Sequence, residues 1–252
     1  MGVKLFERGT RKTVLTNEGM LLRRRAEEIL ELVDKTEREL VEQEEMVEGT
    51  VSLGCGDLTA VQVIPDLIRG FHERYPAVTF ELYTATANHI KERMDRGITD
   101  IGLLLEPINK EKYDYIKLNH QEQWVVVMPP DSPLAKLEAV SPKDLRGLPL
   151  ILPHRLNVQS ELARWFGDEF EKLNILFTSN LPSNSSIMVH HGLAYSIIVK
   201  GSISFWDPEK ITYCPLSPDL TAPSVLAWRR KQPFGLATEK FIGYVKENLH
   251  VE

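Results

Sequence analysis

The stretch GVKLFERGTRKTVLT, residues 2–16, decides how the chain begins to fold. Two short apolar and aromatic segments flank a basic turn that contains Gly9, a pattern typical of a β-hairpin. The hairpin tip carries Arg8, Arg11 and Lys12, residue types that contact phosphate or enter a minor groove. We therefore expect these residues to form a DNA-contacting wing.

A long heptad helix is expected directly after the hairpin, over residues 16–47. About thirty residues at ~1.5 Å each make a rod of roughly 45 Å, too long for one small domain to cover its apolar side. Thr36 and Gln43 weaken the middle of the apolar seam, so other contacts should also hold a dimer together. The alternative is a helix that lies on its own globular domain. The seam positions that predict dimerisation are Leu22, Ala26, Ile29, Val33 and Leu40.

The formal net charge of −6 is unevenly distributed. Residues 4–25 are rich in Lys and Arg, whereas residues 27–48 contain ten acidic residues and two basic ones. This asymmetry is typical of a segment with its basic end near DNA and its acidic end away from it. The alternative for each glutamate is that it simply lies on a solvated helix face. With no apolar run of ~20 residues, no signal-peptide core and only two cysteines, we expect a cytoplasmic protein outside the membrane.

After Gly49 the pattern changes to strands that alternate with helices, as in a parallel α/β sheet. We expect a wing remnant over residues 1–15, a linker helix over 16–48, a first lobe over 49–127 plus 224–252, and a second lobe over 128–223. The expected strands cover residues 51–56, 78–83, 100–105, 124–128, 149–152, 175–178, 193–199 and 225–228. The expected helices cover residues 63–75, 88–96, 160–173, 185–191 and 237–249.

The N-terminal residues resemble the wing and linker start of LysR-type transcriptional regulators, because residues 2–8 are followed by Leu15-Thr16-x-x-Gly19. Further landmarks of that family follow in order and at ordinary spacing. One departure is Ala194, which stands where the family usually has the second glycine of a Gly-x-Gly. The landmarks are Pro65-x-Leu67-x-x-x-Phe71-x-x-x-Tyr75-Pro76-x-Val78, Asp100-Ile101-Gly102-Leu103, Val189-His190-His191-Gly192-Leu193-Ala194 and Leu226-Ala227-Trp228-Arg229.

The resemblance implies an α/β protein with a long N-terminal linker helix, followed by a two-lobe effector domain like that of periplasmic binding proteins. It implies a DNA-binding transcriptional regulator, not an enzyme, whose effector changes oligomer geometry on DNA. In the family the winged helix-turn-helix places its recognition helix upstream of the position of Met1, so we expect this chain to lack that helix. The implied partners are DNA, through the N-terminal domain of the full-length protein, a small-molecule effector, and further copies in a homodimer or homotetramer.

Open α/β sheets bind ligands outside the carboxyl ends of their strands, where helix N-termini offer free N–H groups. Similar positions hold small effectors in the LysR family. For Asp57, Asn88 and Ser185 a helix N-cap is an equal alternative. The residues that we expect to bind an effector are Asp57, Leu58, Thr59, Ala85, Thr86, Asn88, Glu106, Pro107, Pro153, His154, Arg155, Ser183, Asn184 and Ser185.

Arg155 is the strongest of these candidates, because a guanidinium offers a fork of donors to a carboxylate or phosphate. Its alternative is a surface ion pair. Asp57 opposes the expectation of an anionic effector, since a carboxylate in the first loop would repel an acid and favour a neutral, zwitterionic or basic ligand. The charge of the effector therefore stays open at this point.

Other chemistries fit the sequence less well. Residues 54–59 have only a superficial likeness to a dinucleotide loop, because Thr59 replaces the third glycine. His190 and His191 point about 100° apart on a helix and do not form a metal site alone. No nucleophile elbow marks a catalytic serine. We expect no cofactor and no metal, and the main alternative function is a stand-alone small-molecule-binding protein of the solute-binding type.

Overall fold

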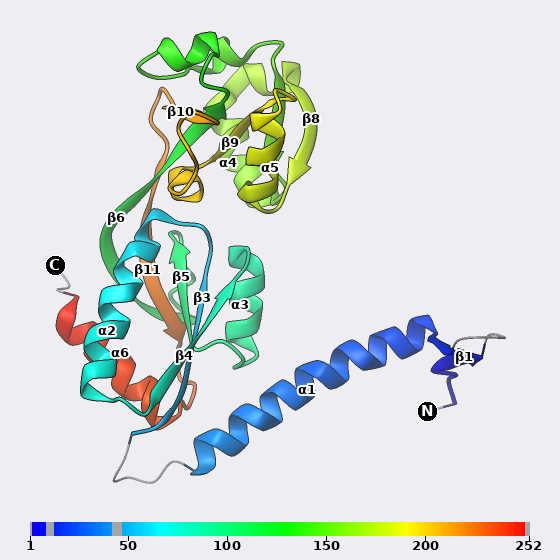
Figure 1. Ribbon diagram of the computed structural model, residues 1–252, viewed down its shortest axis with the longest axis vertical. Coiled ribbons are helices and arrows are strands. Elements are labelled where there is room, and N and C mark those ends of the chain that lie inside the picture. The colour runs from blue at the N-terminus through cyan, green and yellow to red at the C-terminus, as the bar shows by residue number, and fades with distance from the viewer. Residues whose placement is uncertain (1, 9–12, 42–46, 250–252) are drawn as a thin grey trace.

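The computed structural model describes residues 2–8, 13–41 and 47–249 (Figure 1). Strands β1 (Phe6–Arg8) and β2 (Thr13–Leu15) pair antiparallel, with Phe6 opposite Leu15, which confirms the predicted hairpin. The proposed wing contacts are untested, because Arg11, Lys12 and the side chain of Arg8 lie outside the described parts. Gly19, in the first turn of the next helix, lets that helix pack directly on the chain before the hairpin, since a Cβ there would lie 2.1 Å from the carbonyl oxygen of Leu5.

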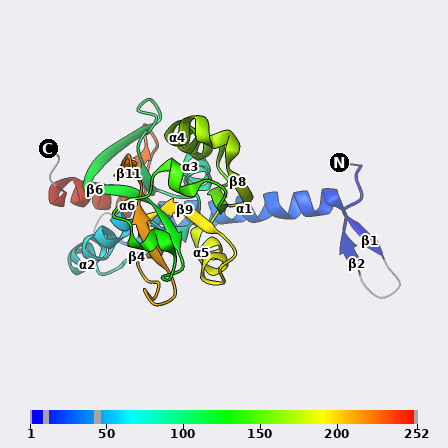
Figure 2. The same ribbon diagram turned by 90° about the horizontal axis from the view of Figure 1, so that it is seen from above.

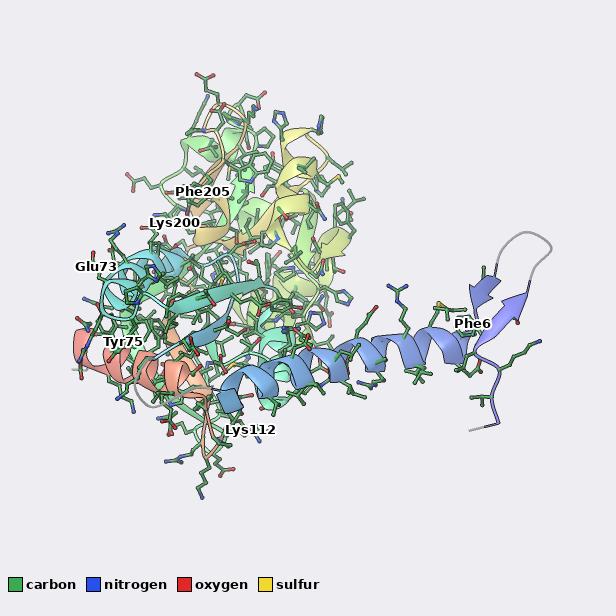
Figure 3. All side chains as sticks on the ribbon, turned by 60° about the horizontal axis from the view of Figure 1, so that its bottom comes forward. Phe6, Glu73, Tyr75, Lys112, Lys200 and Phe205 are labelled. Atoms are coloured by element: carbon green, nitrogen blue, oxygen red, sulfur yellow. The ribbon has the colours of Figure 1, made fainter. Side chains whose placement is uncertain are left out.

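Helix α1 (Asn17–Val41) extends away from the rest of the molecule and carries the hairpin at its far end (Figures 1 and 2). Figure 3 shows Phe6 at that end, remote from both lobes. Val47 lies outside the helix, so the predicted end at residue 47 was too late. The seam is open in the single chain: Ile29 is 61% exposed and Val33 is 44% exposed. The side chain of Leu40 falls among those not described.

The polar side of α1 contacts the first lobe through ion pairs. Glu28 accepts from Arg96 at 3.0 Å, and Glu31 accepts from Arg93 at 2.7 Å. Lys35 Nζ lies 2.5 Å from Oδ1 of Asp100, a carboxylate that is almost fully buried. The solvated-face interpretation was therefore wrong for Glu28 and Glu31, because each pairs with an arginine of the first lobe more than sixty residues away in sequence.

The first lobe is built on the parallel strands β4 (Val78–Thr84), β3 (Gly49–Cys55) and β5 (Ile101–Leu105), in that spatial order. Helices α2 (Ile64–Arg74) and α6 (Leu236–Asn248) cover one face, where Phe71 packs against Phe241 with ring centroids 5.0 Å apart. Helix α3 (Ala87–Asp95) covers the other face through Ile90 and Met94. The predicted βαβαβ unit is confirmed.

The C-terminal end of α3 is fixed by Asp95. Its carboxylate accepts a hydrogen bond from the hydroxyl of Tyr113 at 2.7 Å, pairs with Lys112 at 3.2 Å, and also contacts Arg229. Burial acts to raise the pKa of Asp95, but these partners outweigh it and hold the pKa below the ordinary value.

The second lobe contains the parallel strands β9 (Tyr195–Val199), β7 (Pro149–Pro153) and β8 (Asn174–Ser179), with β10 (Thr212–Pro215) paired to β6 (Tyr113–Met128). Helix α4 (Leu156–Phe166) starts and ends earlier than the predicted helix over residues 160–173. Gly167 ends it with a φ of +55°, and a 3-10 turn follows over Gly167–Lys172. Helix α5 (Pro182–His190) packs on the opposite face through Val189.

Two long strands connect the lobes. Strand β6 pairs with β11 (Thr221–Arg229) in the first lobe, and its residues 124–127 pair with β9 in the second. The sequence predicted only the last part of β6, and its predicted lobe border at residues 127/128 lies at the end of this strand. In the described part of the chain, no helix is long and apolar enough to cross a membrane.

Glu122 of β6 forms hydrogen bonds to both lobes, next to the strands that connect them. Its carboxylate is 1% exposed and accepts hydrogen bonds from Thr59 N at 2.6 Å, Thr59 Oγ1 at 3.1 Å and Gly201 N at 2.8 Å. Thr59 starts the 3-10 turn η1 (Thr59–Val63) of the first lobe, and Gly201 belongs to η5 (Lys200–Ile203) of the second. A Cβ on Gly201 would lie 2.1 Å from Thr59 N, so the two turns are in tight contact.

Candidate functional site

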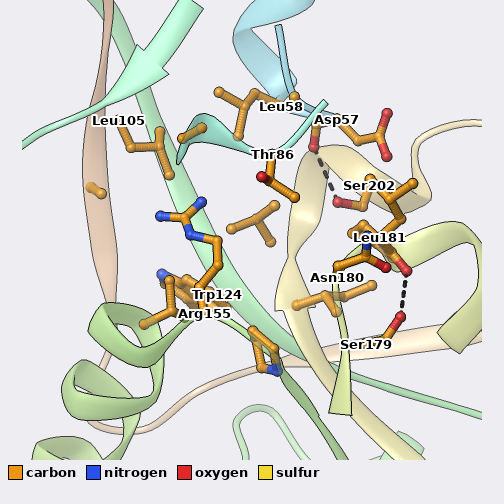
Figure 4. A pocket seen from close by; sticks show the side chains of 18 of the residues that line it. Asp57, Leu58, Thr86, Leu105, Trp124, Arg155, Ser179, Asn180, Leu181 and Ser202 are labelled. Carbon is orange, nitrogen blue, oxygen red and sulfur yellow. Dashed lines mark hydrogen bonds between the residues drawn. The ribbon is translucent and has the colours of Figure 1, made fainter. Parts of the chain in front are cut away.

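A cavity of about 200 Å³ lies between the lobes, at the carboxyl ends of β3, β4, β5 and β7 (Figure 4). Ligand pockets commonly measure roughly 300–1,000 Å³, so this cavity suits a small metabolite. Its walls come from both lobes, because parallel strands bring the loops that follow them to one edge of each sheet.

Nine of the fourteen predicted site residues line this cavity. They are Asp57, Leu58, Ala85, Thr86, Glu106, Pro107, Pro153, Arg155 and Ser185. The structure thus gathers residues from five separate segments of the chain, four of them at the carboxyl ends of strands, as the rule of strand ends predicted. Binding of an effector by these residues stays a prediction.

The other five predicted residues do not line the cavity. Thr59 turns to Glu122, and His154 lies at the surface with its Nδ1 3.0 Å from Oγ1 of Thr178. Three more are exposed on helices, because each helical step turns a side chain by about 100° away from its neighbour. These exposed residues are Asn88, Ser183 and Asn184.

The N-cap alternative was wrong for Asp57, Asn88 and Ser185. The cap positions of η1, α3 and α5 are held by Leu58, Thr86 and Leu181 respectively. Ser185 lies inside α5, where its hydroxyl donates to the carbonyl oxygen of Pro182 at 2.8 Å.

Arg155 reaches into the cavity from the start of α4, and Figure 4 shows its guanidinium on the side of Leu105 and Thr86. Its Nε is buried without a hydrogen-bond partner. Among the described residues no carboxylate lies within ion-pair distance of it, so the surface ion pair is excluded there. Burial lowers the pKa of Arg155, and the charge of Glu161 opposes that shift.

Lys91 is a second cation in the wall, which the sequence reasoning missed. It follows Ala87, another wall residue, by four residues on α3 and therefore shares a helix face with it. That face could be recognised as part of the wall only once the position of α3 was known. Burial lowers the pKa of Lys91, the positive charge of Arg155 lowers it further, and Asp95 opposes both. The two side chains thus bring like charges into one cavity, one from each lobe.

The acidic groups of the wall are placed differently. Glu106 forms an ion pair with Lys117 at 3.1 Å. Figure 4 shows the carboxylate of Asp57 on the side of Ser202, well separated from Arg155. On that same side, Ser202 Oγ donates to the Asp57 carbonyl oxygen at 3.1 Å and joins the lobes directly.

Most of the remaining wall is apolar. Trp124 offers an aromatic surface from β6, and Leu58 and Leu105 come from the first lobe. Ser196 adds a hydroxyl that is buried without a hydrogen-bond partner. Other wall residues outside the prediction are Gly56, Leu103, Leu104, Ile151, Leu152, Val158, Glu161, Ser179, Asn180, Leu181, Pro182, Ile198, Val199 and Ala222.

The chemistry of metal or thiol sites finds no support in the described residues. They contain no group of three or more His, Cys, Asp or Glu side chains that could hold a metal ion. Cys55 and Cys214 are both buried and free, and burial raises the pKa of each thiol. A raised pKa keeps a thiol protonated and unreactive.

Residues 44–250 match the family model described as the LysR substrate binding domain. The chain belongs to the LysR family. It is 28% identical, over 98% of its own length and 84% of the relative's, to the uncharacterised HTH-type transcriptional regulator YvbU of Bacillus subtilis. It is 25% identical, over 99% of its length and 84% of the relative's, to HcaR of Escherichia coli, the Hca operon transcriptional activator.

The fold of this LysR chain is also that of solved family members. The crystal structure of CbnR, a LysR family transcriptional regulator, matches with a TM-score of 0.71 at 19% identity, covering 94% of this chain and 82% of that one. The two-lobe domain and the family assignment from sequence are thereby confirmed. The protein is a LysR-family transcriptional regulator with an effector-binding domain.

Proposed function

We propose that this LysR protein senses a small molecule in the cavity between its lobes and converts binding into a change of dimer geometry on DNA. The single observation that supports this most is that both lobes contribute walls to one small cavity with unsatisfied polar groups. A ligand that binds one arrangement of the lobes better than another shifts the population toward it. We place the protein in the cytoplasm, where DNA and small metabolites are both accessible.

The two-fold partner in this proposal is a second copy of the chain, held along α1. Among the described side chains of α1, seven large apolar ones are exposed in the single chain, including Leu22, Ile29 and Val33. Such a seam needs a partner helix. Replacing Ile29 and Val33 with Asp should lower the mass measured by sedimentation from dimer to monomer. An unchanged mass would place the main interface elsewhere.

The sensing step is tested by a thermal-shift screen with small acids, amines, sugars and nucleosides. A ligand at ~100 times its dissociation constant adds about 2.7 kcal/mol to native-state stability. For a chain of this size that corresponds to roughly 5–11 °C. A hit should also change the fluorescence of Trp124 relative to a Trp124→Phe variant, because this indole lines the cavity. A hit that leaves the Trp124 signal unaffected would argue against binding in the cavity.

The DNA-contacting step rests on Arg8, Arg11 and Lys12 of the hairpin. Replacing these three residues with Gln should weaken binding of duplex DNA by this chain and reduce its salt dependence, since each removed phosphate contact lowers the slope against salt by about one. Equal affinity and equal salt dependence in the variant would remove the hairpin from the DNA contact.

A further inference from the structure

The cavity has an unusual charge arrangement: one half-buried cation enters it from each lobe. Lys91 belongs to α3 of the first lobe, and Arg155 precedes α4 of the second. In the described part of the chain neither side chain has an ion-pair partner, and the Arg155 Nε has no hydrogen-bond partner of any kind. Buried cations are normally paired, because an unpaired charge loses its hydration without compensation.

The acidic residues of the wall do not neutralise this pair. Glu106 is engaged by Lys117, and the Asp57 carboxylate lies on the Ser202 side of the cavity. Glu161 influences Arg155 by its charge but does not contact it. The objection that Asp57 repels an acidic ligand therefore applies to a different part of the cavity from the one that the two cations face.

The lobes are already joined on the Asp57 side. Ser202 donates to the Asp57 carbonyl oxygen there, and Glu122 binds both Thr59 and Gly201. On the Arg155 side the like charges of Lys91 and Arg155 repel each other across the gap. A bound anion would replace this repulsion with two attractions and would draw the lobes together on that side.

We propose that the cavity takes a small organic acid, whose carboxylate or phosphate group lies between Lys91 and Arg155 and links the two lobes. The rest of the ligand is small and at least partly apolar, because Trp124, Leu58 and Leu105 form the remaining walls within about 200 Å³. This inference rests on the proposed sensing function and adds the chemical class of the effector.

The experiment is calorimetric titration of this chain with matched pairs of compounds that differ only in charge. The acids are benzoate, phenylacetate and succinate, and their partners are benzamide, phenylacetamide and succinamide. Phenyl phosphate and inorganic phosphate distinguish a phosphate ligand from a carboxylate. We expect at least one acid to bind at least 10-fold more tightly than its amide.

Two variants locate the anion. Arg155→Gln and Lys91→Gln should each weaken binding of that acid by at least 10-fold and leave binding of the amide unchanged. Arg164→Gln and Lys240→Gln, which change exposed cations elsewhere, should leave both affinities unchanged. Neither Gln variant in the cavity should lower the melting temperature of the unliganded protein, because each removes a half-buried charge that has no ion-pair partner among the described residues.

The possible failures are distinguishable. Amides, amines or sugars that bind as tightly as the acids, with a Trp124 response, would overturn the acid class and leave the sensing function standing. Acid binding that is unaffected by both cavity variants would also overturn the proposal, because the anion would then lie elsewhere. Binding of no compound of any class would overturn both the acid class and the sensing function. The comparison of acid with amide uses the unmodified chain, so it holds even if a variant does not fold.

Discussion

Replacement of Glu122 by Gln tests whether this residue pins the two lobes. The carboxylate accepts on both oxygens, from Thr59 N and Oγ1 on one side of the crossing and from Gly201 N on the other. The glutamine side chain keeps one oxygen as an acceptor, but its NH₂ group is a donor and would face a backbone N–H group that the carboxylate had bound. One hydrogen bond to a charged group is then lost, and one buried donor is left unsatisfied.

The magnitude follows from those contacts. A hydrogen bond to a charged group contributes about 1.5–3 kcal/mol, and an unsatisfied buried donor costs about 1–3 kcal/mol. Removal of the carboxylate's own desolvation penalty offsets part of this loss. We expect Glu122→Gln to destabilise the protein by about 2–3 kcal/mol, which corresponds to a fall in Tm of roughly 4–12 °C.

The assay is urea unfolding followed by circular dichroism, with scanning calorimetry for the Tm. Glu81→Gln is the matched control, because it makes the same chemical change at an exposed position of β4. It should change the free energy of unfolding by less than about 0.5 kcal/mol. If Glu122→Gln is as stable as Glu81→Gln, the buried hydrogen bonds do not hold the lobes, and the reasoning is refuted.

Three further outcomes follow from contacts elsewhere. Lys35→Met leaves the buried Asp100 without its cation and should lower the free energy of unfolding in urea by about 3 kcal/mol, whereas Lys240→Met should change it little. If the two variants are equally stable, the ion pair between α1 and the first lobe does not contribute to stability. Asp95 has a lowered pKa, so its stabilisation is complete above pH 3.8 and is lost as the pH falls further; Asp95→Asn should flatten that acid limb in a pH series of melts. Cys55 and Cys214 should resist Ellman's reagent in the native protein and react after unfolding; fast native reaction would contradict their burial.

Local patterns were sufficient to predict several elements. The hairpin around residues 6–15, the start of α1 and the alternation of strands and helices all follow from spacing of a few residues. The sequence missed the first part of β6, because Lys117, Asn119 and Gln121 are poor strand formers and hide the apolar alternation of their neighbours. Pairing with β11, about a hundred residues later, holds that segment extended.

The site shows the same division between local and long-range information. Loops at the ends of parallel strands converge by geometry, so Asp57, Thr86 and Arg155 could be placed from sequence. Lys91 could not be separated from other surface lysines until the position of α3 against β5 was known. Glu122 looked like an ordinary charge in a polar segment, and its role depends on two turns about sixty and eighty residues away.

The ion pairs between α1 and the first lobe attach the helix to that lobe, so the helix turns when the lobe turns. Beyond Glu28, the first residue of the contact, the helix runs on for eleven residues to Asn17, about 17 Å at ~1.5 Å per residue. A rotation of the lobe by about 10° would therefore move that end by about 3 Å, close to the 3.4 Å rise of one base step in DNA. In the dimer on DNA that we propose, a slight turn of each lobe would therefore be enough to move each hairpin by about the rise of one base pair.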